Sequence, residues 1–170
     1  MKNGREKPEE TVGRIVKKFG LTIGIAESCT GGLLCHRITS VPGSSDYFIG
    51  GVIAYNNDLK KHILNVPKEI LQKFGAVSKE TAKAMAWGAK KRLGSNIGIA
   101  ITGIAGPAGG TRTKPVGTVF IAIAGRTKEN NQRFLFKGTR QGIKLKATNK
   151  ALEMLKIFLE QPGSYRRQAV

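Results

Sequence analysis

Short apolar runs alternate with helical patterns along most of this sequence, and that alternation restricts the fold more than any other feature. The runs at residues 21–26, 48–55 and 97–101 have the length and composition of buried strands. Segments with apolar residues at helical spacing lie before, between and after them. Because strands that alternate with helices pack as a sheet covered on both faces, the pattern predicts an α/β fold. We expect a three-layer α/β/α sandwich with a mixed, mostly parallel sheet.

The remaining elements follow from the same two periodicities. Two further strands, at residues 116–124 and 132–136, are joined by a polar turn and indicate a hairpin near the end of the chain. We expect one domain over residues 9–160, between a flexible N-terminus over residues 1–8 and a polar tail over residues 161–170. The expected helices cover residues 9–19, 33–40, 57–64, 67–74, 78–92 and 142–159.

The composition, apart from its charge, is that of an ordinary globular domain. A length of 170 residues suits one domain, and a hydrophobic fraction of 40% argues against disorder. Two cysteines, Cys29 and Cys35, exclude a disulfide framework and a four-cysteine zinc site. Residues 1–8 lack the apolar core of a signal peptide, and no apolar run approaches the roughly 20 residues that span a bilayer. We therefore expect a cytoplasmic protein with free thiols.

The charge balance is unusual, because 29 lysines and arginines against 11 acidic residues give a net charge of +18. Such an excess attracts anions in general, including phosphates, nucleic acids and acidic membranes, without selecting one of them. A nucleic-acid-binding module is one alternative function. Against it, aromatic residues make up only 6%, the sequence has no RRM or KH signature, and the lysines are dispersed. We expect neither a specific nucleic acid nor a membrane as partner.

The first candidate site is the turn that follows the run at residues 21–26. It contains Glu27, Ser28, Thr30, Gly31 and Gly32. Backbone N–H groups and hydroxyls at the start of a helix suit a phosphate or carboxylate, but a capping turn without a ligand fits the same residues. Both interpretations stay open. The cysteine within this turn, at position 29, is expected to be buried and inert.

The second candidate combines the serines after Pro42 with Tyr55 and Lys60. A serine becomes a nucleophile when a base removes its proton, and a buried lysine or a tyrosine can do so. These residue types can therefore form a serine amidase site without histidine. The alternative is a turn serine, a core tyrosine and a surface lysine.

The third candidate is the glycine-rich loop over residues 102–110, which contains Thr102, Gly103 and Gly106. Its length and small side chains allow a ligand to approach the backbone closely. Arg140, at the start of the last helix, is placed to hold a phosphate or to face solvent. His36 and His62 form no recognised ligand spacing with the cysteines, so we expect no metal and no cofactor.

Six ordered segments resemble one protein family. They are residues 26–32 (AESCTGG), 41–45 (VPGSS), 55–57 (YNN) with Lys60, 75–78 (GAVS), 102–107 (TGIAGP) and 114–117 (KPVG). Together they resemble the CinA C-terminal domain family, named for competence/damage-inducible proteins, over about residues 9–160. This family often follows a separate nucleotide-hydrolase domain. Because the sequence contains no such domain, it is similar to the stand-alone form.

The resemblance implies nicotinamide mononucleotide (NMN) deamidation, which gives nicotinic acid mononucleotide and ammonia and belongs to pyridine nucleotide salvage. It implies Ser45, rather than Ser44 or Ser28, as the catalytic serine, with Tyr55 and Lys60 as its activating partners. A homo-oligomer, taken to be a dimer, is also expected. A catalytically silent ligand-binding domain is the remaining alternative. The expected substrate-binding residues are Glu27, Ser28, Thr30, Gly31, Gly32, Thr102, Gly103, Gly106 and Arg140.

Overall fold

Five strands form one sheet in the computed structural model, which describes residues 6–161. Their bounds are Ile23–Glu27 for β1, Phe48–Ile53 for β2, Ile97–Gly103 for β3, Thr118–Ala124 for β4 and Glu129–Leu135 for β5. In space the strands follow the order β2-β1-β3-β4-β5. β1 pairs in parallel with both β2 and β3, whereas the β3–β4 and β4–β5 pairs are antiparallel.

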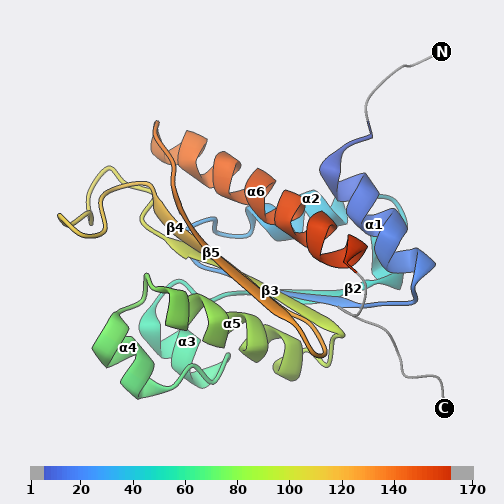
Figure 1. Ribbon diagram of the computed structural model, residues 1–170, viewed down its shortest axis with the longest axis horizontal. Helices are drawn as coiled ribbons and strands as arrows, with labels where there is room; N and C mark the ends of the chain where they lie inside the picture. Colours follow the sequence, from blue (N-terminus) through green and yellow to red (C-terminus); the bar gives the residue numbers. More distant parts are fainter. Residues whose placement is uncertain (1–5, 162–170) are drawn as a thin grey trace.

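Helices cover both faces of this sheet (Figure 1). One face carries α1 (Pro8–Lys18), α2 (Leu33–Thr39) and α6 (Arg140–Glu160). The other face carries α3 (Asn57–His62), α4 (Lys68–Phe74) and α5 (Lys79–Arg92). A short 3-10 helix, η1 (Ser44–Asp46), precedes β2. Among residues 6–161, no helix combines the length and the apolar character that crossing a bilayer requires.

The expected α/β/α sandwich with a mixed sheet is confirmed, although "mostly parallel" describes it only loosely because half of the pairings are antiparallel. β3 continues through Thr102 and Gly103, which the glycine-rich composition placed in a loop, because these two residues pair with β4. β5 starts earlier than expected, at Glu129, because it pairs with β4 along its polar beginning. Residues 1–5 and 162–170, within the expected flexible N-terminus and polar tail, lie outside the described residues.

The core divides into two clusters because side chains alternate along each strand. On β3, Ile97, Ile99 and Ile101 face the layer of α1, α2 and α6. The intervening positions are small, and Ala100 packs with α5 on the opposite face. Gly98 is smaller still, and it lets the backbone of α5 come directly against the strand. The isoleucines therefore pack against the layer of α1, α2 and α6. The small residues between them determine how closely α5 approaches the sheet.

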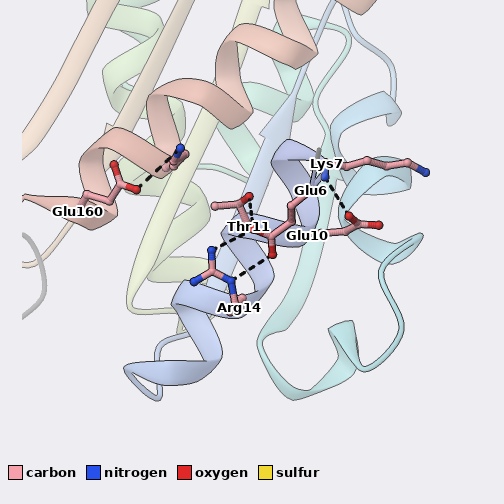
Figure 2. Close-up of polar contacts among 7 residues, drawn as sticks. Glu6, Lys7, Glu10, Thr11, Arg14 and Glu160 are labelled. Atoms are coloured by element: carbon pink, nitrogen blue, oxygen red, sulfur yellow. Dashed lines mark hydrogen bonds and ion pairs between the residues drawn. The ribbon is translucent and has the colours of Figure 1, made fainter. Parts of the chain in front are cut away.

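Polar contacts at the start of α1 are shown in Figure 2. The backbone N–H of Lys7 donates to the Glu10 carboxylate at 2.9 Å, which caps the helix. The Glu6 carboxylate accepts hydrogen bonds from the side chains of Thr11 and Arg14. Deeper in the fold, the guanidinium of Arg37 in α2 donates two hydrogen bonds to the carboxylate of Glu9 in α1, at 2.6 and 2.9 Å. The Arg37–Glu9 pair fixes α1 against α2, the helix that follows the candidate turn.

We expect Gly98→Ala to lower the free energy of unfolding by about 1–3 kcal/mol, the usual cost of overpacking a close-packed interior. A Cβ at this position would overlap the carbonyl oxygen of Ala86 and lie 2.8 Å from the Cβ of Lys90. Gly142→Ala in α6 is the matched control, because its Cβ would meet nothing closer than 3.4 Å. Urea denaturation should show the control unchanged or stabilised, since alanine favours helices. Equal effects of the two substitutions would contradict this account of the α5 packing.

Candidate active site

β1, β2 and β3 run in parallel, so their carboxyl ends lie together at one end of the sheet. Open α/β sheets usually bind ligands beyond this end. A pocket of about 270 Å³ opens there. The loop between β3 and β4 and the start of α6 lie at the same end of the molecule (Figure 1). The lining residues are Ser28, Cys29, Tyr55, Lys60, Ala76, Val77, Thr102, Gly103, Ile104, Ala105, Gly106, Ala108, Gly109 and Arg140.

A buried lysine lies in the wall of this pocket. Helix α3 starts at an Asn56 cap, whose side chain accepts the N–H of Leu59 at 2.9 Å, and it turns Lys60 inward. The Lys60 side chain is only 1% exposed. Its Nζ donates to the carbonyl oxygens of Ala54 at 2.7 Å and Tyr55 at 3.3 Å. Burial lowers the pKa of the Lys60 ammonium, so its neutral form is more accessible than that of a surface lysine.

Lys60 also contacts the side-chain hydroxyl of Ser28, whose Oγ lies 3.3 Å from Nζ. Ser28 directly follows β1, and its backbone N–H donates to Ile101 of β3 at 2.9 Å. The serine is therefore held by the sheet at one side and meets the lysine at the other. A hydroxyl beside a buried amine of lowered pKa has the arrangement of a nucleophile with its base.

Ser45 is not in the pocket. It belongs to η1, which precedes β2, whereas Tyr55 and Lys60 follow that strand. Six extended residues separate the two ends of β2, about 20 Å at the usual rise of a strand. The structure therefore does not bring Ser45 together with Tyr55 and Lys60 of the same chain, and it places Ser28 beside Lys60 instead. A sequence signal that could have found Ser28 is the strand order: Ser28 follows one strand and Tyr55 follows the next, and residues that follow parallel strands lie at the same end of the sheet.

A buried carboxylate organises the turn after β1. Glu27 is fully buried, and its oxygens accept the backbone N–H groups of Gly32, Leu34 and Cys35 at 3.0, 3.2 and 2.8 Å. The backbone N–H groups at the start of α2 are therefore hydrogen bonded to Glu27 and are not free to bind a ligand. The hydrogen bonds of Glu27 are those of a capping turn, and Ser28 of the same turn faces the pocket.

The structure brings only part of this turn to the pocket. Glu27, Thr30, Gly31 and Gly32 do not line the pocket, and only Ser28 of the five expected residues does. Thr30 is fully buried, and its hydroxyl has no hydrogen-bond partner among the described residues. Gly31 and Gly32 have positive φ angles of 63° and 95°, which glycine adopts without strain, so they serve the turn.

The rim of the pocket is tied together by Arg140. Its guanidinium donates to the carbonyl oxygen of Gly106 at 2.6 Å and to the Tyr55 hydroxyl at 2.7 Å. Tyr55, 57% exposed, therefore contacts the arginine and not a serine. The expected residues Thr102, Gly103 and Gly106 line the pocket as well. The Thr102 hydroxyl donates to the Ala76 carbonyl at 2.8 Å and so joins β3 to the segment before α5.

Cys29 lines the pocket next to Ser28 but has the properties of an inert thiol. It is a buried free cysteine, and burial raises the pKa of its thiol to about 12. At neutral pH the thiolate is therefore negligible, and the thiolate is the reactive form. Within the described part of the chain, no group of three or more histidine, cysteine or acidic side chains is arranged to hold a metal ion.

We expect Glu27→Gln to lower the free energy of unfolding by about 2–3 kcal/mol, because hydrogen bonds to a charged acceptor are lost and an amide N–H₂ faces a backbone donor. Glu10→Gln is the control, since that carboxylate accepts the single N–H of Lys7. Its effect in the same urea titration should stay below about 1 kcal/mol. An unchanged free energy of unfolding in Glu27→Gln would show that the buried carboxylate does not stabilise the turn.

Comparisons with known proteins agree with this architecture. A family model described as the CinA C-terminal domain matches residues 5–159. A relative from Desulforudis audaxviator, named after competence and damage induction, is 53% identical over 92% of this chain. A CinA-like protein of Thermotoga maritima is 50% identical over 91%. The chain spans only 38% of the length of each of these two curated relatives.

Solved structures of similar proteins share the fold. The crystal structure of the competence/damage inducible protein CihA from Agrobacterium tumefaciens has a TM-score of 0.85 and 42% sequence identity, and the match covers 95% of this chain and all of that one. A CinA superfamily protein from Enterobacter cloacae has a TM-score of 0.87 at 31% identity, with 94% and 96% of the two chains covered. The family model, the relatives and the structures agree, and this chain belongs to the CinA C-terminal domain family.

Proposed function

We propose that this chain is an amidohydrolase that deamidates nicotinamide mononucleotide, with Ser28 as nucleophile and Lys60 as its base. The observation that carries the proposal is the buried Lys60 Nζ, 3.3 Å from the Ser28 hydroxyl. The substrate comes from the family resemblance, because the geometry by itself indicates only a carboxamide or ester of modest size. The product would be nicotinic acid mononucleotide, which links the chain to pyridine nucleotide salvage.

The surroundings of Lys60 suit a base that gains and then returns a proton. Burial favours the neutral amine before reaction. Once Nζ has taken the Ser28 proton, the carbonyl oxygens of Ala54, Tyr55 and Asn56, at 2.7, 3.3 and 3.5 Å, can hold the ammonium. Carbonyl dipoles that are already in place cost no reorganisation when charge develops. The same residues therefore serve both protonation states.

In the first half of the reaction, Ser28 Oγ bonds to the carboxamide carbon and the amide oxygen takes the negative charge. Lys60 then gives its proton to the leaving nitrogen, and ammonia departs from an acyl-serine. In the second half, Lys60 takes a proton from water, and the hydroxide bonds to the acyl carbon. The bond from that carbon to Ser28 Oγ then breaks, Oγ takes the proton back from Lys60, and the acid product leaves. Lys60 thus exchanges one proton in each half, and no cofactor is needed for the balance.

One backbone donor next to Ser28 is placed to stabilise the oxyanion. Cys29 directly follows Ser28 and lines the pocket. Among residues 6–161, no oxygen accepts its backbone N–H. Because the N–H after a nucleophilic serine often faces the developing oxyanion, this donor supports an acyl-transfer mechanism.

The rim offers positive charge for the substrate phosphate. Arg140 is exposed at the pocket mouth, and its contacts with Gly106 and Tyr55 hold the guanidinium in one position. Lys144, one turn further along α6, lies near Gly31 at the same end of the sheet. A phosphate binds well to an arginine that is already oriented. In this proposal Tyr55 positions Arg140 and takes no proton from serine.

We expect Ser28→Ala to lose essentially all NMN deamidation while it keeps its fold, because the substitution removes only the nucleophile. Ser95→Ala is the matched control, since Ser95 is equally buried and its hydroxyl donates to Ile97 far from the pocket. Ammonia release from purified protein measures both variants, and circular dichroism checks their folding. Near wild-type turnover in Ser28→Ala, with loss in Ser45→Ala, would return the nucleophile to Ser45. No release by the wild-type protein would favour a silent ligand-binding domain.

We expect kcat/KM to fall as pH is lowered through the depressed pKa of Lys60, because only the neutral amine can accept the serine proton. Lys60→Arg keeps the charge but cannot deprotonate, so it should lose at least ~10²-fold in kcat. Lys60→Met is the control for packing, because methionine fills similar space in the pocket wall but has no amine and no charge. If Lys60→Arg retains much more activity than Lys60→Met, the lysine contributes its charge and is not the base.

A further inference from the structure

A second cavity lies on the face of the sheet that carries α3, α4 and α5 (Figure 1). Its volume is about 510 Å³, nearly twice that of the candidate active site, and the two share no lining residue. Side chains of α4, of α5 and of the segment that joins α3 to α4 surround it. We call it the α4–α5 groove, and its apolar wall contains Leu64, Pro67, Ile70 and Trp87.

Close packing forms the groove in the absence of any ligand. Gly88 of α5 allows the backbone of Leu64 to lie directly on the helix, because a Cβ there would overlap the Leu64 carbonyl oxygen. The Trp87 Nε1 donates to the Glu129 carboxylate at 3.1 Å. The same carboxylate pairs with Lys83 at 2.6 Å. These contacts fix the indole and neutralise the charge of Lys83 at the rim.

The two ends of the groove differ in charge. Lys91 and Arg92 lie at one end, in the last turn of α5. Arg92 Nε donates to the carbonyl oxygen of Ile63 at 3.0 Å, which orients its guanidinium. Among residues 6–161, the other guanidinium nitrogens have no hydrogen-bond partner, and Lys91 forms no ion pair. Glu80 lies in the first turn of α5, roughly 16 Å away along the helix axis.

This distribution of charge indicates what the groove can bind. The free cations are concentrated at one end, so they suit a single anionic group better than a row of acidic side chains. The apolar wall suits a hydrocarbon body, whose burial is favourable. A volume of about 510 Å³ lies within the range of small-molecule sites, about 300–1,000 Å³.

We propose that the α4–α5 groove binds a small amphiphilic anion, which is a ligand with an apolar body and one carboxylate or phosphate head. The body would lie against Leu64, Ile70 and Trp87, and the head would lie between Lys91 and Arg92. In this orientation the negative charge is attracted by both cations and is far from Glu80. The proposal does not depend on the reaction that the candidate active site catalyses.

Tryptophan fluorescence tests binding at the groove itself, because Trp87 is half-buried and is the only tryptophan of the chain. Octanoate should shift its emission to shorter wavelength and saturate, since the chain displaces water from the indole. The affinity should rise about fourfold for each methylene from hexanoate to octanoate. Octyl phosphate compares the two heads, and a saturable shift with either anion supports the proposal.

Octyltrimethylammonium has the same chain and the opposite charge, so it should give no saturable shift. A saturable shift of equal affinity with this cation would show that the groove does not select anions. That result, or no saturable shift with either octanoate or octyl phosphate, would overturn the proposal.

Charge reversal distinguishes the groove from the general positive charge of the protein. The double variant Lys91→Glu with Arg92→Glu should weaken octanoate binding about fivefold or more. Lys73→Glu with Lys79→Glu is the matched control, because it changes the net charge equally at exposed residues outside the groove. Its affinity should stay within about twofold of wild type, since Debye screening acts over about 8 Å at physiological salt. Glu80→Gln should also stay within about twofold, for the same reason.

Circular dichroism of each variant confirms that it is folded before its affinity is compared. Equal weakening by the two double variants would show that octanoate follows the overall charge and not the groove. Unchanged affinity in Lys91→Glu with Arg92→Glu would show that these cations do not hold the head. Either result would overturn the proposal.

Discussion

The buried carboxylate of Glu27 determines where the chain goes after β1. A carboxylate that loses its hydration is tolerated only when its oxygens are hydrogen bonded, and here three backbone N–H groups of the following turn and helix meet that need. The same bonds satisfy donors that any helix leaves unpaired at its start. Since Ser28 lies between the carboxylate and the helix that it caps, its position is set on both sides before any ligand arrives.

Lys60 is also buried, but its hydrogen-bond partners compensate the lost hydration less completely than those of Glu27 do. An ammonium without a counter-ion loses several kcal/mol of hydration free energy when it leaves water, so burial lowers the pKa of Lys60 and makes its neutral amine more accessible. The groups that Nζ contacts are carbonyl oxygens and one hydroxyl, with no carboxylate among its bonded partners. A carboxylate would hold the proton on the lysine permanently. Carbonyl dipoles stabilise the ammonium less, which leaves the proton exchangeable.

Local patterns predicted the layers of the fold, because β1, β3 and β4 are buried on both faces and therefore read as continuous apolar runs. Local patterns gave the wrong strand bounds where residues of loop-like composition pair with a neighbouring strand. Glu129 of β5 and Thr102 of β3 both pair with β4 in this way. Most of the pocket lining was anticipated from loops that follow strands. The choice between Ser28 and Ser45 was not anticipated, because it depends on which strand end each serine lies at, and the family resemblance assigned the serine without that strand order.

The protonated thiol of Cys29 has a consequence for how this site meets reactive chemicals. Oxidants and alkylating reagents attack thiolates, and burial keeps this sulfur in its thiol form beside the Ser28 hydroxyl. Peroxide, which disables enzymes that depend on a thiolate, should therefore react slowly with Cys29. Under the proposed mechanism, reagents that acylate or phosphonylate hydroxyls would block the pocket, whereas thiol-directed probes would leave it active.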